Sequence, residues 1–84
     1  MKCVRLEKRV PAKNQLRFYC LDLQPTLFGE WSIVREWGRI GHGGRMLLTT
    51  FPSYAEAASA FAGKVAEKRR RGYLPTPATL PTHS

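Results

Sequence analysis

Apolar and polar side chains alternate along the first part of the chain as they do in β-strands. Residues 3–10 place charged side chains on one face and apolar ones, including Val4 and Leu6, on the other. Residues 15–23 carry apolar groups on both faces, which indicates a central strand that is covered on both sides. Pro25 is expected to end that strand because proline cannot donate a ladder hydrogen bond.

Two further strands are predicted on either side of a glycine-rich loop. Residues 30–38 alternate again, and residues 45–51 form a fourth apolar run that Pro52 stops. Between these runs, Gly41-His42-Gly43-Gly44 has the composition of a hairpin loop.

One helix is predicted after Pro52. Ser53 and Glu56 have the spacing of a capping box, with the serine as N-cap. The apolar residues that follow at helical spacing are Ala57, Ala58, Phe61, Ala62 and Val65. The basic residues 68–71 suit the negative end of the helix dipole, and Gly72 is a natural residue just past a helix end.

Four strands followed by one helix predict a small α+β domain, in which the helix packs on an antiparallel sheet. With 84 residues the chain has room for one such domain, which we expect to span residues 1–74. Residues 75–84 contain three prolines and no charged side chain, and they are predicted to be a disordered or extended tail.

The charge balance indicates a polyanionic partner. Fourteen Lys and Arg against six Asp and Glu give a formal net charge of +8. The excess lies at the two ends, with +5 in residues 1–17, zero in residues 18–52 and +3 in residues 53–84. Such a distribution favours nucleic acid or an acidic membrane surface, and the alternative is a charge that serves only solubility.

Several other classes of function lack support in the sequence. Cys3 and Cys20, with His42 and His83, match no usual spacing of zinc ligands, so we expect neither a metal nor a cofactor. No nucleophile, metalloprotease or phosphate-loop motif is present, so we expect no enzyme. No apolar run approaches the ~20 residues of a membrane span, and no secretory signal is recognisable. A cytoplasmic protein without a membrane partner is expected, associated with the nucleoid if it binds DNA.

Residues 35–45 are the part of the chain richest in residue types that can bind a ligand. They combine one tryptophan with four glycines and three arginines at a strand end and a loop. An aromatic ring beside arginines suits stacking on a base with phosphate neutralisation alongside, and glycines let a backbone approach a ligand. The alternative is a core aromatic and an ordinary hairpin. Trp31 and Trp37 would share a face of a regular strand, yet we expect Trp31 in the core and Trp37 partly exposed.

The run Trp37-Gly38-Arg39-Ile40-Gly41 resembles the signature of the WGR domain family, which is named for its first three residues. Residues 17–23 are similar to the basic, aromatic and leucine pattern of an early strand in that family. Later landmarks, similar to the family's last strand, helix and helix exit, are Phe51, Ala58, Phe61 and Gly72-Tyr73. The similarity covers about residues 2–74. Leu16 stands where the family often has asparagine.

The resemblance implies a fold and a partner. WGR domains are small antiparallel sheets with a helix, best known from poly(ADP-ribose) polymerases, and bacteria also carry free-standing members, which this chain resembles. By position, Trp37 would stack at the exposed end of a broken DNA strand, Gly38 would allow close approach, and Arg39 would face DNA or a neighbouring protein. The chain has neither the transferase domain nor the zinc fingers of those enzymes, so the resemblance implies no polymerase activity.

Other basic residues could add contacts to the DNA backbone. Arg5 and Arg9 could form a stripe with Arg17 on one strand face, or they could merely solvate an outer face. The run 68–71 points in four directions on a helix, so it can supply only auxiliary contacts. The residues predicted to bind nucleic acid are therefore Trp37, Gly38, Arg39, Arg45, Arg5, Arg9, Arg17, Arg69 and Arg70.

The sequence thus predicts a non-catalytic module that binds DNA, most directly at ends or nicks. Two alternatives stay open. One is an adaptor that meets a DNA-acting enzyme through Arg39 and the surface around Trp37. The other is RNA binding, which the charge supports equally.

Overall fold

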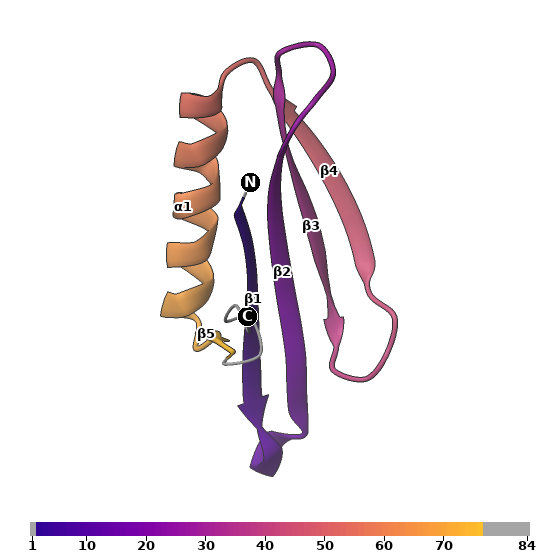
Figure 1. The fold of residues 1–84 in the computed structure, drawn as a ribbon. Helices are drawn as coiled ribbons and strands as arrows, with labels where there is room; N and C mark the ends of the chain where they lie inside the picture. The colour runs from indigo at the N-terminus through magenta and orange to yellow at the C-terminus, as the bar shows by residue number, and fades with distance from the viewer. Residues whose placement is uncertain (1, 77–84) are drawn as a thin grey trace, which may run out of the picture.

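A five-stranded antiparallel sheet carries one helix on one of its faces (Figure 1). The computed structural model describes residues 2–76. The strands are β1 (Lys2–Val10), β2 (Gln15–Pro25), β3 (Trp31–Arg39), β4 (Arg45–Phe51) and β5 (Leu74–Pro75), and the helix is α1 (Tyr54–Arg70). A short 3-10 helix, η1 (Pro11–Lys13), joins β1 to β2. The strand order is β4-β3-β2-β1-β5, so the predicted α+β architecture is confirmed.

The strand register decides which side chains lie under the helix. Leu6 pairs with Tyr19, Tyr19 with Trp37, and Trp37 with Arg45, so these four residues form one row across β1 to β4. Because successive side chains of a strand point to opposite faces, this row determines on which face of the sheet each remaining side chain lies. We call the side that α1 covers the helix face and the opposite side the open face.

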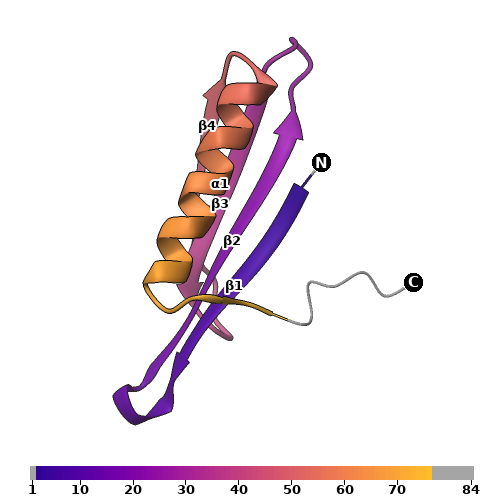
Figure 2. The same ribbon diagram turned by 90° about the vertical axis from the view of Figure 1, so that its left-hand side faces the viewer.

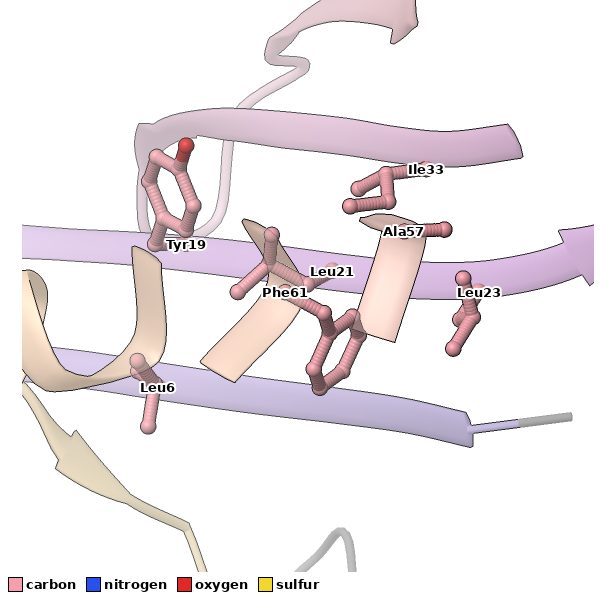
Figure 3. Packing of buried hydrophobic residues seen from close by; sticks show 7 residues of the cluster. All are labelled: Leu6, Tyr19, Leu21, Leu23, Ile33, Ala57 and Phe61. Carbon is pink, nitrogen blue, oxygen red and sulfur yellow. The ribbon is translucent and has the colours of Figure 1, made fainter. Parts of the chain in front are cut away.

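The core lies between the helix face and α1 (Figure 3). It consists of Leu6, Tyr19, Leu21, Leu23, Ile33, Ala57 and Phe61. Ala57 is fully buried, and its small side chain lets the helix approach the sheet closely, while Phe61 fills the space toward β1 and β2. Strand β2 is the central strand of the sheet, as its apolar residues on both faces predict.

Both ends of α1 follow the predicted capping pattern. The Ser53 hydroxyl accepts a hydrogen bond from the Glu56 backbone N–H at 3.2 Å, which confirms the N-cap. At the other end, Gly72 has a φ of +96°. The N–H of Gly72 donates to the Arg69 carbonyl and the N–H of Tyr73 to the Lys68 carbonyl, which together form a Schellman motif.

Strand β2 ends at Pro25, as expected. The structure differs from the expected elements by one additional strand. Strand β5 was not predicted: Leu74 and Pro75 pair with Glu7 and Leu6 at the β1 edge. The remainder of the expected tail, residues 77–84, lies outside the described residues.

Candidate nucleic-acid interface

A cleft opens where the sheet extends past the C-terminal end of α1. The β1–β2 hairpin continues beyond the last helical turn, which leaves this end of the helix face uncovered (Figure 2). We call it the tryptophan cleft; its volume is about 390 Å³, and it is lined by Asn14, Leu16, Arg17, Phe18, Tyr19, Trp37, Gly38, Arg39, Lys68 and Tyr73. Within the part of the chain that the structure describes, the lining includes three cationic side chains and none that is acidic.

Aromatic rings form the floor of the tryptophan cleft. The rings of Trp37 and Tyr19 are stacked, with centroids 6.1 Å apart and an interplanar angle of 22°. Tyr73 meets Tyr19 edge-on at 6.4 Å. Tyr19 is buried, whereas Trp37 stays half-buried. The stack therefore fixes the orientation of the Trp37 ring and still leaves part of it accessible.

The two tryptophans do not differ in burial as expected. Trp31 and Trp37 both lie on the helix face, and both are half-buried against the core. They differ in position instead: Trp31 packs edge-on against Tyr54 at the start of α1, with ring centroids 4.9 Å apart, whereas Trp37 lies at the far end. The expectation of a core Trp31 is therefore wrong, and the expectation of a partly exposed Trp37 is confirmed. The two residues share a face because strand β3 keeps its alternation without a bulge.

Lys68 reaches into the cleft from the last turns of α1. Its ammonium nitrogen lies 4.5 Å from the centroid of the Tyr19 ring and 5.5 Å from that of Tyr73. Burial lowers the pKa of Lys68 below its usual 10.5; the carboxylate of Glu67 opposes this shift, while the nearby positive charges of Arg71, Lys64 and Arg35 add to it. This cation is thus partly desolvated and held over aromatic faces.

A row of cations crosses three strands beside the aromatic floor. Lys8 pairs with Arg17, and Arg17 pairs with Arg39, so all three lie on the helix face in one cross-strand row. We call these three residues the cation row. Like charges directly opposite each other destabilise a sheet, so the row favours an anion above it. Arg39 is held by a hydrogen bond from Nη2 to Asn14 Oδ1 at 3.1 Å, and no carboxylate among residues 2–76 forms an ion pair with it.

Gly38 of the motif and Gly44 of the β3–β4 loop pack closely against each other on the open face. A Cβ on Gly38 would lie 2.9 Å from the Cα of Gly44, and one on Gly44 would lie 2.9 Å from Phe18 Cζ. The β3–β4 loop therefore folds back closely over Gly38 and covers the Phe18 ring, which is only 5% exposed. Gly38 permits a close approach, as expected, but the neighbour it admits in this structure is the chain's own loop.

The expected stripe of Arg5, Arg9 and Arg17 does not form. Arg17 lies on the helix face, whereas Arg5 and Arg9 lie on the open face, because the register pairs Arg17 with Lys8. Both open-face arginines bind Glu7, with nitrogen–oxygen distances of 3.0 and 2.9 Å. Burial raises the pKa of Glu7, but the hydrogen bonds from the two guanidinium groups outweigh it and hold the pKa below 4.5.

Arg5 also has a structural contact: its guanidinium carbon lies 4.6 Å from the centroid of the Phe18 ring. The remaining predicted residues lie outside the tryptophan cleft. Arg69 and Arg70 are exposed on α1, one and two positions beyond Lys68, so they point away from the direction it takes. Arg45 pairs with Trp37 and, with Gly43 and Gly44, lines a shallower adjoining hollow.

Seven residues of the cleft and the cation row are absent from the predicted binding set: Lys8, Asn14, Leu16, Phe18, Tyr19, Lys68 and Tyr73. Tyr73 and Lys68 could have been placed together, because a Schellman motif brings the residue after the terminal glycine against the third-last helical residue. Lys8 and Tyr19 needed the β1–β2 register, which residue types alone do not determine.

Neither a clustered metal-ligand group nor a membrane-spanning helix is found in the described part of the chain. No group of three or more His, Cys, Asp or Glu residues among residues 2–76 is arranged to hold a metal ion. Within the same residues, no helix is long and apolar enough to cross a membrane. What the cleft offers chemically is stacking and anion binding.

Comparison with known proteins agrees with the sequence motif. The WGR domain family matches residues 2–79. An uncharacterized protein of Sinorhizobium fredii, y4dW, is 38% identical over 72 residues, which are 86% of this chain and 35% of that protein. The chain therefore spans about a third of that relative's length. No solved structure matches. On the match over residues 2–79, this chain belongs to the WGR domain family.

Proposed function

We propose that this domain binds DNA at ends or nicks through the tryptophan cleft. Trp37 stacks on the terminal base pair that a break exposes, while the cation row and Lys68 bind the phosphates beside it. The observation that carries the proposal is the composition of the cleft: a half-buried tryptophan and three cations share one concave surface, in which the described residues place no acidic side chain.

Stacking supplies the preference for breaks. The Trp37 ring is oriented by Tyr19, so little conformational freedom is lost when a base meets its accessible part. Base–aromatic stacking contributes about 1–3 kcal/mol per base. An intact duplex offers no unstacked base face, so only ends and nicks can use this contact.

Phosphate binding supplies the affinity. Each cation that neutralises a phosphate releases a counterion, which contributes about −0.9 to the slope of log K against log salt. Arg17, Arg39 and Lys68 line the tryptophan cleft, and Lys8 lies next to Arg17 in the cation row. Their mutual repulsion in the free protein is relieved when a phosphate backbone lies across them.

Fluorescence anisotropy with three labelled duplexes of identical sequence tests the proposal: one blunt-ended, one nicked, and one closed by hairpin caps at both ends. Each is titrated in a salt series with wild type, Trp37→Ala, Arg39→Ala and Arg70→Ala. Arg70→Ala is the matched control, because it removes the same charge from an exposed position outside the cleft.

We expect tighter binding to blunt and nicked DNA than to the closed duplex, and loss of that preference in Trp37→Ala. Arg39→Ala reduces the salt slope by about 0.9, while Arg70→Ala retains the end preference. Equal affinity for all three duplexes, or an end preference that survives Trp37→Ala, contradicts the proposal.

A second candidate is an adaptor that docks on a protein. Leu27 and Phe28 at the tip of the β2–β3 loop are 96% and 85% exposed. Thr26 fixes this loop, because its hydroxyl accepts hydrogen bonds from the N–H groups of Phe28 and Glu30 at 3.2 Å. The tip lies at the end of the molecule away from the tryptophan cleft, so both contacts could exist together (Figure 1). Absence of DNA and RNA binding at physiological salt would favour this candidate.

A further inference from the structure

Strand β4 is an edge of the sheet and lacks the features that usually protect an edge. Its neighbour on one side is β3, and nothing among the described residues pairs with its other side. Its seven residues, Arg45–Phe51, include no proline and one charged residue, Arg45, at the first position. Edge strands usually carry charges, prolines or bulges that prevent further pairing.

The opposite edge shows the protection that β4 lacks. There β5 covers part of β1 with only two residues, the second of which is Pro75. Strand β1 itself carries charged side chains through its middle, including Glu7 and Lys8. Among residues 2–76 the two edges of the sheet therefore differ, and β4 is the one that presents a long backbone edge with apolar side chains.

These apolar side chains lie on both faces of β4. Met46 and Leu48, on the open face, are 67% and 61% exposed, and Leu47, on the helix face, is 45% exposed. Such an edge can pair with a further strand, which would satisfy its unpaired backbone groups and cover the apolar side chains on both faces.

We propose that β4 pairs antiparallel with β4 of a second copy of this chain, about a twofold axis at Leu48. This register places Leu48 opposite its own symmetry mate, Leu47 opposite Thr49, and Met46 opposite Thr50. It also places Arg45, the one charged residue of the strand, opposite Phe51 rather than opposite the second Arg45. A parallel pairing in register would bring the two arginines together, which is unfavourable.

The pairing has a consequence for the tryptophan cleft. The twofold axis is perpendicular to the sheet, so both helices lie on the same face of a continuous ten-stranded sheet. Arg45 pairs with Trp37 at the cleft end of β4, and Phe51 lies six positions further along the strand. Strand rise and spacing then place the two Trp37 residues about 25 Å apart, at diagonally opposite ends. One dimer presents two clefts on one face.

Analytical ultracentrifugation of the full chain over a concentration series tests this pairing, at 0.05 and 0.5 M salt. The expected mass at high concentration is twice the 9.5 kDa of the single chain. Because pairing joins two chains that each carry a net charge of +8, the dimer fraction rises with salt, which is opposite to the effect of salt on polyanion binding.

Two substitutions identify the surface. Leu48→Lys places like charges opposite each other at the twofold axis, so the variant is expected to stay at the single-chain mass. Leu74→Lys is the matched control, because Leu74 is also 61% exposed but lies in β5, and it is expected to dimerise like wild type. Circular dichroism checks that both variants are folded.

A cross-link tests the register independently. In a background with Cys3→Ser and Cys20→Ser, Leu48→Cys is expected to form a disulfide-linked dimer under mild oxidation, whereas Leu74→Cys is not. A wild-type chain that stays at 9.5 kDa at millimolar concentration overturns the proposal. So does a dimer that survives Leu48→Lys, or equal cross-linking by the two cysteine variants.

Discussion

Replacing Gly44 with alanine tests how closely the β3–β4 loop packs over the sheet. The added Cβ would lie 2.5 Å from the Trp37 carbonyl oxygen and 2.9 Å from Phe18 Cζ, both far inside ordinary contact. The carbonyl belongs to the backbone of β3, so the loop must move instead. Overpacking of this kind costs about 1–3 kcal/mol, and if the loop moves away instead, partial exposure of the Phe18 ring costs about as much in its place.

We therefore expect Gly44→Ala to lower the free energy of unfolding by about 2 kcal/mol, which lowers Tm by roughly 8–16 °C in a domain of this size. Gly43→Ala is the control, because a Cβ on Gly43 meets nothing within 4 Å. Thermal unfolding followed by circular dichroism compares the two. If Gly44→Ala is as stable as Gly43→Ala, the loop does not pack over Gly38 and Phe18 as described.

Three further predictions concern the helix cap and two charged groups. Ser53→Ala removes the N-cap hydrogen bond and is expected to cost about 1 kcal/mol, measured by urea unfolding; no loss would mean that the cap contributes nothing. The pKa of Glu7 is lower in the folded state than its usual 4.5, so the ionised carboxylate stabilises the fold. This stability is lost as pH falls through the folded-state pKa, so Tm between pH 5 and 3 should fall less in Glu7→Gln than in wild type. The pKa of Lys68 lies below 10.5, and a bound phosphate favours its charged form. DNA affinity should therefore fall between pH 8 and 10 more steeply in wild type than in Lys68→Arg, whose side chain stays charged. Parallel pH profiles of the two proteins would show that Lys68 does not contact DNA.

Local signals were sufficient for most of the fold. Ser53 and Gly72 determine the two ends of α1 through short-range hydrogen bonds, so their residue types alone predict the helix. Strand β4 begins and ends as predicted, between Gly44 and Pro52. Strand β5 could not be predicted in this way, because two residues that include a proline form a strand only where an existing edge is available to them.

The candidate site depended more on register than on residue type. The Trp37-Gly38-Arg39 motif is recognisable in the sequence, but the neighbours of Trp37 come from the pairing of β3 with β2. The same pairing separates Arg17 from Arg5, since a difference of one residue in register moves a side chain to the other face. Nonlocal pairing is thus what distinguishes the arginines in the cleft from those bound to Glu7.

Fluorescence of a single tryptophan tests the central claim most directly. The chain has two tryptophans, so Trp31→Phe leaves Trp37 as the only tryptophan and Trp37→Phe leaves Trp31. Each variant is titrated with blunt-ended DNA to saturation, and binding is verified by anisotropy of a labelled duplex. The account predicts that DNA quenches Trp37 by base stacking and shields it from acrylamide, while Trp31 emission stays unchanged. Saturating DNA that leaves Trp37 emission and accessibility unchanged would contradict binding through the tryptophan cleft.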